Sequence, residues 1–317
     1  MIDLQRMVNP LGTSKKVIEA VKEHLHEVHE YTSSMKELVT KIAKLNDVKE
    51  EQVIITDGAD GALTLIAQSI FKGNRIIIPQ PCFHRYKDYP SYLGVNYTLV
   101  DAKKGILINE EKVLECAGDI FLIASPNNPT GFVISNKFLK EALEKFKLVI
   151  LDETLLLFLN GKQNFIKQFP NLIIIRSFSK LFGLAGLRVG YVISSEENIE
   201  KIKSVSTPYK VNYIGQVAAL TVLDDKEYIK KTQELVEEQR LFLYSVLKNE
   251  NIKNSKGLCY CLPLTKKQQK NIDESGICIQ SDMGFGYGKK AESFFRFAIS
   301  TQKNNLSLIK ALIGEQK

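Results

Sequence analysis

Short apolar runs alternate with helix-like segments between residues 50 and 195, and this alternation limits the possible folds more than any other feature. The runs are Val53–Ile55, Arg75–Pro79, Asn96–Val100, Asp119–Ser125, Leu148–Asp152, Leu172–Ser177 and Val189–Ser194. Most of them are continuously apolar, which is typical of strands that are buried on both faces. We therefore expect an α/β fold with an open, mostly parallel sheet that is covered by helices.

Helix-like patterns lie between and after these runs. Ala59–Phe71 and Asn136–Phe146 have apolar residues at helical spacing, and Ser135 suits the N-cap position of the second. Further along the chain, two longer helical patterns follow at Tyr213–Leu223 and Glu227–Lys248.

The change of pattern near residue 210 predicts two domains, which is the number that a chain of 317 residues suggests. We expect a large domain over residues 30–210, which holds the sheet. Residues 1–29 and 211–317 are expected to form a smaller α+β domain.

The composition excludes several classes of partner. Basic residues number 43 and acidic residues 36, but the net charge of +7 is spread along the chain, so we expect no nucleic-acid partner. No apolar run approaches the ~20 residues that span a membrane, and no signal-peptide core is present, so we expect no membrane partner. The five cysteines have no framework spacing and are expected to be reduced thiols, which favours a cytoplasmic location.

One lysine has the surroundings of a nucleophile. Lys180 follows an apolar run, stands among Ser177, Ser179 and three glycines, and precedes Arg188 by eight residues. A lysine there can lose enough hydration to react as an amine, while the arginine and the serines hold an anion beside it. This combination suits an aldehyde cofactor that carries a phosphate. The alternative is a strand, a turn and a second strand with an exposed lysine.

Other polar groups also follow the predicted strands. Asp152 ends a buried run, where a carboxylate is costly unless it meets a cation such as a protonated pyridine nitrogen. Asn128 lies in the turn Ser125–Gly131, and small residues in Thr56–Ala62 expose backbone N–H groups at the start of a helix. In open α/β sheets, ligands bind at the carboxyl ends of the strands, so we expect these groups to lie together.

The stretch Ser177–Tyr191 resembles the lysine signature of fold-type I pyridoxal-phosphate enzymes, the class I and II aminotransferases. The resemblance implies a fold-type I transferase with pyridoxal 5'-phosphate as cofactor. Lys180 would then form the internal Schiff base, Asp152 would pair with the ring nitrogen, and both would be catalytic. The cofactor phosphate would bind to Ser177, Ser179 and Arg188.

The same resemblance assigns the remaining cofactor contacts. Asn128 would donate to the phenolic oxygen of the cofactor, and Phe83 would stack on its ring. Gly58, Ala59 and Asp60 match the phosphate turn of the family. Tyr31 matches a tyrosine that reaches the cofactor phosphate of the partner subunit, which implies a homodimer.

Substrate contacts are expected from three residues. Arg296 stands among apolar residues, and its planar fork suits the α-carboxylate of an amino acid; the alternative is an arginine on an edge strand that faces solvent. By the resemblance Arg296 binds this carboxylate, with Asn128 and Asn9 beside it. No metal site is expected, because His24 and His26, in a polar helical segment, do not share a helical face.

Within the superfamily, the chain is nearest to the histidinol-phosphate aminotransferases and threonine-phosphate decarboxylases, through Asn9–Gly12 and Gly183–Tyr191. Two of its departures from them concern positions that would meet the cofactor and the substrate. Leu155 stands where they usually have an aromatic residue, and Gln280 stands where they tend to have an arginine for the substrate phosphate. A phosphorylated substrate therefore does not follow from the sequence.

The sequence thus predicts an aminotransferase that uses Lys180 to move an amino group between an amino acid and a 2-oxo acid. The expected donors include an amino-acid-like phosphate such as histidinol phosphate. Two alternatives stay open: a decarboxylase of the threonine-phosphate type and a non-catalytic protein that binds the cofactor.

Overall fold

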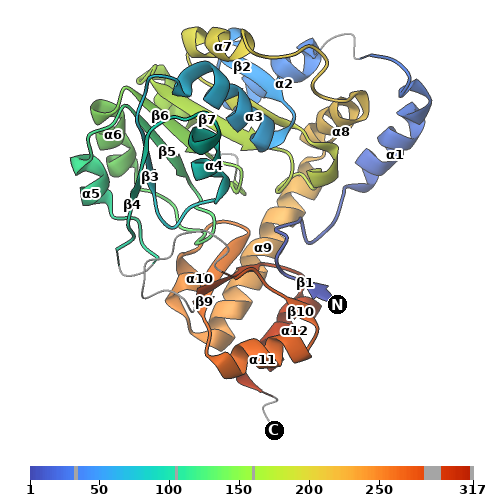
Figure 1. The fold of residues 1–317 in the computed structure, drawn as a ribbon. Helices are drawn as coiled ribbons and strands as arrows, with labels where there is room; N and C mark the ends of the chain where they lie inside the picture. The colour runs from blue at the N-terminus through green and yellow to red at the C-terminus, as the bar shows by residue number, and fades with distance from the viewer. Residues whose placement is uncertain (32–34, 104–105, 159–160, 282–293, 315–317) are drawn as a thin grey trace.

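The expected parallel sheet forms the centre of the larger lobe in the computed structural model, which describes residues 1–31, 35–103, 106–158, 161–281 and 294–314 (Figure 1). Its seven strands lie in the order β2-β8-β7-β6-β5-β3-β4. They are β2 (Val53–Thr56), β3 (Ile76–Pro79), β4 (Tyr97–Val100), β5 (Ile120–Ala124), β6 (Leu148–Asp152), β7 (Leu172–Ser177) and β8 (Gly190–Ile193). Each corresponds to one of the apolar runs, and the α/β fold is confirmed.

The direction of the strands gathers their carboxyl ends at one edge. The pairs β3–β4, β3–β5, β5–β6 and β6–β7 are parallel, and only β8 runs against both of its neighbours, β2 and β7. Strands β2, β3, β5, β6 and β7 therefore all end on the same side. Every turn that follows them opens at this edge, which is where the predicted site residues lie.

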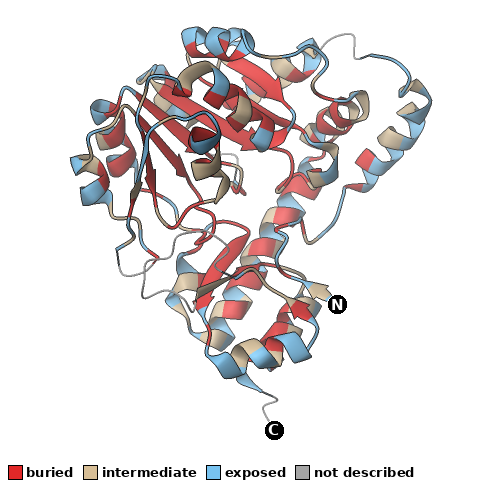
Figure 2. Ribbon diagram, viewed as in Figure 1, coloured by how far each residue is buried: buried red, intermediate tan, exposed pale blue. Residues whose placement is uncertain are grey.

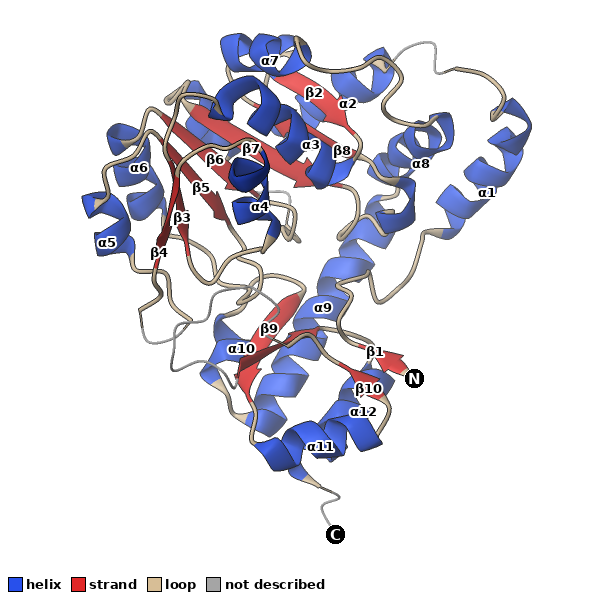
Figure 3. Ribbon diagram, in the orientation of Figure 1, coloured by secondary structure: helices blue, strands red, loops and turns tan. Residues whose placement is uncertain are grey.

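Helices cover both faces of the sheet, as its continuously apolar strands require (Figure 3). The helices of this lobe are α2 (Lys36–Asn46), α3 (Gly58–Ile66), α4 (Arg85–Tyr92), α5 (Glu110–Glu115), α6 (Asn136–Lys145) and α7 (Glu196–Lys203). A π-helical turn (Ala67–Phe71) extends α3, so the expected helix Ala59–Phe71 is present. The predicted N-cap is confirmed, because Ser135 Oγ accepts a hydrogen bond of 3.0 Å from the backbone N–H of Phe138.

Alternate residues of each strand belong to two separate cores. Phe121 and Ile123 of β5 pack toward α6 and its neighbours, while Ile120 and Leu122 pack on the opposite face toward α3 and α7. Figure 2 shows the strands as a buried layer between half-exposed helices. The sheet is therefore a rigid base for the turns at its edge.

The smaller lobe follows a long helix out of the larger one (Figure 1). It contains α9 (Lys226–Leu247), α10 (Glu250–Asn254), β9 (Cys259–Pro263), α11 (Lys266–Glu274), β10 (Ile277–Cys278), β11 (Phe294–Ala298) and α12 (Gln302–Ile313). Strand β11 pairs antiparallel with β9, and the N-terminal strand β1 (Ile2–Asp3) pairs in parallel with β10. The first residues of the chain thus belong to the same lobe as its last third.

Helices α1 (Lys15–His24) and α8 (Tyr213–Asp224) pack together on the larger lobe. Val17 and Val222 belong to the core of the large sheet, and the core of the smaller lobe starts at Val236 and takes in Leu4 from the N-terminus. Packing would therefore place the boundary after residue 229, whereas the sequence predicts it at 210. The division into 30–210 against 1–29 with 211–317 stays a prediction.

The remaining helical turns are short 3₁₀ segments at Leu25–Glu27, Glu50–Gln52, Gln163–Lys167 and Ala185–Leu187. Over the ranges that the structure describes, no helix has both the length and the apolar character to cross a membrane.

Candidate active site

A cavity of about 170 Å³ opens at the carboxyl edge of the sheet. Its lining includes most of the residues that the sequence singles out, together with several that it does not. The lining residues are Met7, Ala59, Asp60, Leu63, Phe83, Tyr86, Ala124, Pro126, Asn128, Asp152, Thr154, Leu155, Ser177, Ser179, Lys180, Ala185 and Arg188. The turns after β2, β3, β5, β6 and β7 all contribute, as the strand directions require.

Lys180 lies in the turn between β7 and β8, which are neighbours in the sheet. Burial lowers the pKa of its amine to about 8, and the positive charges of Arg296 and Arg188 act in the same direction. With a pKa of about 8, roughly a tenth of the amine is unprotonated at pH 7, compared with less than about a thousandth for a lysine in water. The exposed lysine that was the alternative at the sequence level is not what the structure contains.

Asp152 is the last residue of β6 and lies fully within the protein. Its Oδ2 accepts a hydrogen bond of 2.7 Å from the Tyr86 hydroxyl, and its Oδ1 accepts one of 2.8 Å from the backbone N–H of Thr154. Burial raises the pKa of Asp152 above its usual value, and the hydrogen bonds from Thr154 and Tyr86 oppose that rise. This carboxyl group can hold a cation at the floor of the cavity.

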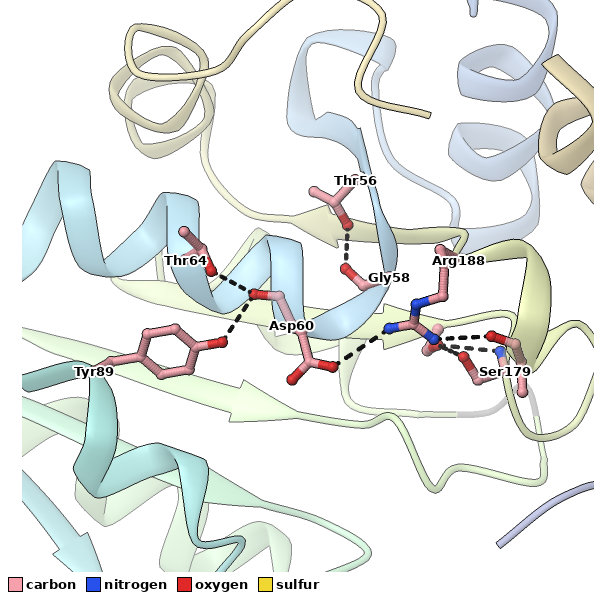
Figure 4. A network of polar contacts seen from close by, with 9 residues as sticks. Thr56, Gly58, Asp60, Thr64, Tyr89, Ser179 and Arg188 are labelled. Atoms are coloured by element: carbon pink, nitrogen blue, oxygen red, sulfur yellow. Dashed lines mark hydrogen bonds and ion pairs between the residues drawn. The ribbon is translucent and has the colours of Figure 1, made fainter. Parts of the chain in front are cut away.

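An anion-binding corner lies at the start of α3. Ser177 Oγ lies 2.9 Å from Ser179 Oγ and accepts a hydrogen bond of 3.1 Å from the backbone N–H of Ser179. Arg188 has a left-handed backbone (φ 53°), and its guanidinium lies between Asp60 and Ser179, 3.4 Å from Asp60 Oδ2 (Figure 4). The N-terminus of α3, two hydroxyls and a guanidinium together favour a phosphate group.

Gly58 makes this corner possible because its backbone approaches Arg188 closely. Its φ is +81°, and a Cβ at this position would lie 2.8 Å from Arg188 Nη2. Any side chain at position 58 would therefore displace the arginine as well as strain the turn.

Arg296 connects the smaller lobe to the cavity. Its Nη1 donates to Asn128 Oδ1 at 2.8 Å and its Nη2 donates to the backbone carbonyl of Gln5 at 2.6 Å. Arg296 is 7% exposed, which excludes the solvent-facing alternative. Because Asn128 turns its oxygen toward the arginine, its Nδ2 is the group that can donate to a ligand. Gln280 pairs with Arg296 through both backbone groups, at 3.2 and 2.9 Å.

The residues at the positions expected to meet the ring and the phenolic oxygen of a cofactor are partly apolar. Phe83 lines the cavity and meets the ring of Tyr86 edge to face, with centroids 5.6 Å apart and an interplanar angle of 89°. Leu155 also lines the cavity and is buried, so it presents a methyl surface at a position that relatives usually fill with an aromatic residue.

Four predicted site residues are not among those that line the cavity. Gly58 and Arg296 adjoin the lining residues Arg188 and Asn128, whereas Asn9 and Tyr31 lie elsewhere. The Asn9 amide donates to the Leu181 carbonyl at 2.8 Å and to Thr232 Oγ1 at 3.1 Å, and its oxygen accepts from the backbone N–H of Leu11. Tyr31 is 78% exposed. Among the described residues, neither lines the cavity. The polar atoms of Asn9 are thus already engaged within the protein, and its role in substrate binding stays a prediction.

Sequence reasoning missed several residues of the site. Tyr86 and Thr154 hold Asp152, Met7 closes one wall, and the Gln5 carbonyl holds Arg296. The spacing of Phe83 and Tyr86 was an available signal, since residues three apart at the start of a helix share a face. No local signal marks Gln5, because its contact is made by the backbone and spans nearly the whole chain.

The strand order, with a reactive lysine and a phosphate-binding corner at one edge, is the arrangement of the fold-type I pyridoxal-phosphate enzymes. The chain matches the family described as Aminotransferase class I and II over residues 1–312. It therefore belongs to the class I and II aminotransferases, and its cofactor is pyridoxal phosphate.

Individual relatives agree with this placement. The histidinol-phosphate aminotransferase of Caldicellulosiruptor saccharolyticus is 32% identical, in an alignment that covers 98% of this chain and 91% of that protein. The crystal structure of the histidinol-phosphate aminotransferase from Clostridium acetobutylicum has a TM-score of 0.88 at 25% identity, covering 99% of this chain and 98% of that one. The fold is also that of the Sinorhizobium meliloti histidinol-phosphate aminotransferase in complex with pyridoxal-5'-phosphate (TM-score 0.85, 18% identity, 98% and 89% coverage).

The donor groups of the cavity fit this cofactor. Ser177, Ser179 and Arg188 suit its phosphate. Asp152 suits a protonated pyridine nitrogen, and the amine of Lys180 suits the aldehyde.

Proposed function

We propose that this aminotransferase takes its amino group from an amino acid or an amino-acid-like phosphate of the histidinol-phosphate type and passes it to a 2-oxo acid. The observation that carries this proposal is the presence of Lys180 and Asp152 on the wall of one buried cavity. The names of the relatives support the choice of donor.

We assign the catalytic roles to these two residues. When bound, pyridoxal phosphate supplies an aldehyde and a ring that accepts electrons from the substrate. Lys180 would hold the aldehyde of the cofactor and, once released, would take a proton from the substrate Cα and return it to the C4′ carbon of the cofactor. A pKa of about 8 permits this near neutral pH. Asp152 keeps a positive charge on the ring nitrogen.

Binding roles follow from the same arrangement. Ser177, Ser179, Arg188 and the backbone N–H groups from Gly58 to Asp60 hold the phosphate. Asn128 donates its Nδ2 to the phenolic oxygen, and Phe83 covers the ring.

Arg296 binds the substrate carboxylate. Its guanidinium is buried and already oriented by two acceptors, so little conformational entropy is lost when a carboxylate binds. Gln280 pairs with Arg296 and carries no charge, so it offers no ionic contact to a substrate phosphate. The donor test therefore includes phosphorylated donors.

We further propose that the active unit is a homodimer. Ile18, Leu25, Val28 and Tyr31 are large apolar or aromatic side chains that lie exposed along α1 and the segment after it, and the ring of Tyr31 lies 4.8 Å from that of Tyr209. Such a patch is typical of a protein interface. The cytoplasmic location expected from the cysteines stays a prediction. Light scattering after gel filtration measures the mass in solution, and a monomer would contradict the dimer.

The donor is tested with single amino donors, including histidinol phosphate and threonine phosphate. We expect one donor to change the absorbance of the bound cofactor, with one equivalent of oxo product and the aminated cofactor. Release of carbon dioxide instead would contradict the proposal. No response to any donor would also count against it.

A further inference from the structure

The carboxylate of Asp152 is held by a residue that no motif identifies. Tyr86 lies in the first turn of α4 and reaches across to β6, where its hydroxyl donates to Asp152 Oδ2 at 2.7 Å. Tyr86 is 1% exposed and Asp152 is 5% exposed, so water does not compete for this bond. The bond joins two turns of the cavity edge that are 66 residues apart in the sequence.

The second oxygen of Asp152 is fixed independently. The backbone N–H of Thr154 donates to Oδ1 at 2.8 Å. With one donor on each oxygen, the plane of the carboxylate and the direction of its remaining lone pairs are set before any ligand arrives. A carboxylate with one donor alone could rotate about that bond.

These donors also act on the charge of the group, because they oppose the rise in the pKa of Asp152 that burial causes. A buried carboxyl favours its neutral form, and each hydrogen bond to the ionised form opposes this preference. A neutral Asp152 would carry its own proton and could not balance a proton on a pyridine nitrogen. Tyr86 cannot itself transfer a proton in this role, because burial and the charge of Asp152 raise the pKa of its hydroxyl well above its usual value.

We propose that Tyr86 is a positioning residue for the aminotransferase reaction: its hydroxyl orients Asp152 and keeps this carboxylate ionised, so that the ring nitrogen of the cofactor stays protonated. This inference rests on the proposed role of Asp152. It assigns to Tyr86 an effect on the reactivity of the bound cofactor, in addition to any effect on stability.

The test uses the purified enzyme loaded with pyridoxal phosphate that carries nitrogen-15 in the ring. The Tyr86→Phe variant keeps the shape of the side chain and removes only the hydroxyl. We expect its ring nitrogen resonance to move toward the unprotonated value. We also expect kcat to fall about tenfold with a smaller change in KM, because a hydrogen bond to a charged group is lost. An unchanged resonance in a folded, loaded Tyr86→Phe variant would overturn the proposal.

Tyr89→Phe is the matched control. Tyr89 lies one turn further along α4, is also buried, and donates to the backbone carbonyl of Asp60 at 3.1 Å instead of to a carboxylate. We expect it to leave the ring nitrogen resonance unchanged. If Tyr89→Phe shifts the ring nitrogen resonance by the same amount, the shift in Tyr86→Phe would reflect a general disturbance of α4. That result would contradict the inference.

Asp152→Asn separates this inference from the function on which it rests. If Asp152→Asn moves the resonance and Tyr86→Phe does not, the role of Tyr86 is wrong and that of Asp152 stands. If Asp152→Asn leaves the resonance unchanged, the proposed role of Asp152 is itself wrong. Should Tyr86→Phe fail to fold, Tyr86→His replaces it, because it keeps a ring N–H donor and is expected to retain a protonated ring nitrogen. An unprotonated ring in Tyr86→His would then count against the proposal.

Discussion

The two ends of the cavity are built in different ways. At the cofactor end, Asp152, Lys180 and the anion-binding corner are positioned by strands of one sheet, and each lies within a few residues of the end of a strand. At the substrate end, Arg296 comes from β11 in the smaller lobe and is held by Asn128 of the larger lobe and by the backbone of Gln5. The cofactor end depends on the rigid sheet, whereas the substrate end depends on three separate segments, which contain Arg296, Asn128 and Gln5.

This difference indicates which end of the site can accept substitutions without loss of the chemistry. The proposed cofactor contacts lie at the ends of strands of the sheet, which cannot shift without disturbing two cores. The proposed substrate end is assembled between the lobes, so we expect changes there to alter the substrate while the chemistry is kept. Two departures noted in the sequence are relevant here. Leu155 lines the cavity, and Gln280 pairs with Arg296 at the substrate end.

The largest expected effect separates two lysines that burial perturbs alike. Burial lowers the pKa of both Lys180 and Lys210 to about 8, but only Lys180 is among the lining residues of the cavity. We expect Lys180→Ala to lower kcat by at least about a thousandfold, because it removes the group that holds and moves the proton. Thermal unfolding should show that the fold is retained.

Lys210→Ala is the control for that comparison, since the amine of Lys210 donates to Ser206. We expect its turnover to stay within about threefold of the parent enzyme, as for a substitution away from reacting groups. Substantial turnover in Lys180→Ala would overturn the assignment of the catalytic lysine.

Arg296→Gln tests the substrate end. It removes the charge that meets the substrate carboxylate and keeps a polar side chain of similar reach. We expect kcat/KM for the amino donor to fall about a hundredfold, because a charge-assisted bidentate contact is lost. The affinity for pyridoxal phosphate, measured by fluorescence titration, should change little. An equal loss of cofactor affinity would show that the two ends are not separate.

The pH dependence of cofactor capture probes Lys180 alone. Only the unprotonated amine reacts with an aldehyde, so capture by the cofactor-free enzyme should accelerate as pH rises and level off above a midpoint of about 8. Stopped-flow absorbance measures the rate, with Lys180→Ala as the blank. A rate that still increases steeply at pH 10 would indicate an ordinary, hydrated lysine.

The smallest effect is expected at Asn9. Its amide and its oxygen are occupied by Leu181, Thr232 and Leu11. We therefore expect Asn9→Ala to lower the free energy of unfolding by about 1–3 kcal/mol, through the buried partners it leaves unpaired. KM for the donor should stay within about twofold of its original value. A large rise in KM without loss of stability would restore Asn9 as a substrate contact.

The sequence predicted the sheet and the cofactor end well for a physical reason. Continuous apolar runs have few alternatives to buried parallel strands, and the groups at their ends are brought together by strand direction alone. Ser177 and Arg188, for example, are eleven residues apart and line the same cavity because β7 and β8 are adjacent antiparallel strands.

The substrate end was harder to predict because its contacts join distant segments. A single arginine among apolar residues indicated Arg296, but nothing in the sequence indicates that a backbone carbonyl at Gln5 would hold it. Asn9 was assigned from its motif, and the structure shows its polar atoms engaged in local contacts and in contacts with distant segments. The role of Tyr86 cannot be inferred without the structure, because it depends on the contact of its hydroxyl with Asp152 at the end of β6.

The close approach of Gly58 to Arg188 has a consequence for the history of the family. A Cβ at position 58 would lie 2.8 Å from Arg188 Nη2, so a side chain there would push the guanidinium aside and would also strain a turn whose φ is +81°. A substitution at Gly58 therefore carries two costs at once, whereas a substitution at Arg188 leaves the turn as it is. Among descendants of this chain, Gly58 should be the slower of the two positions to change.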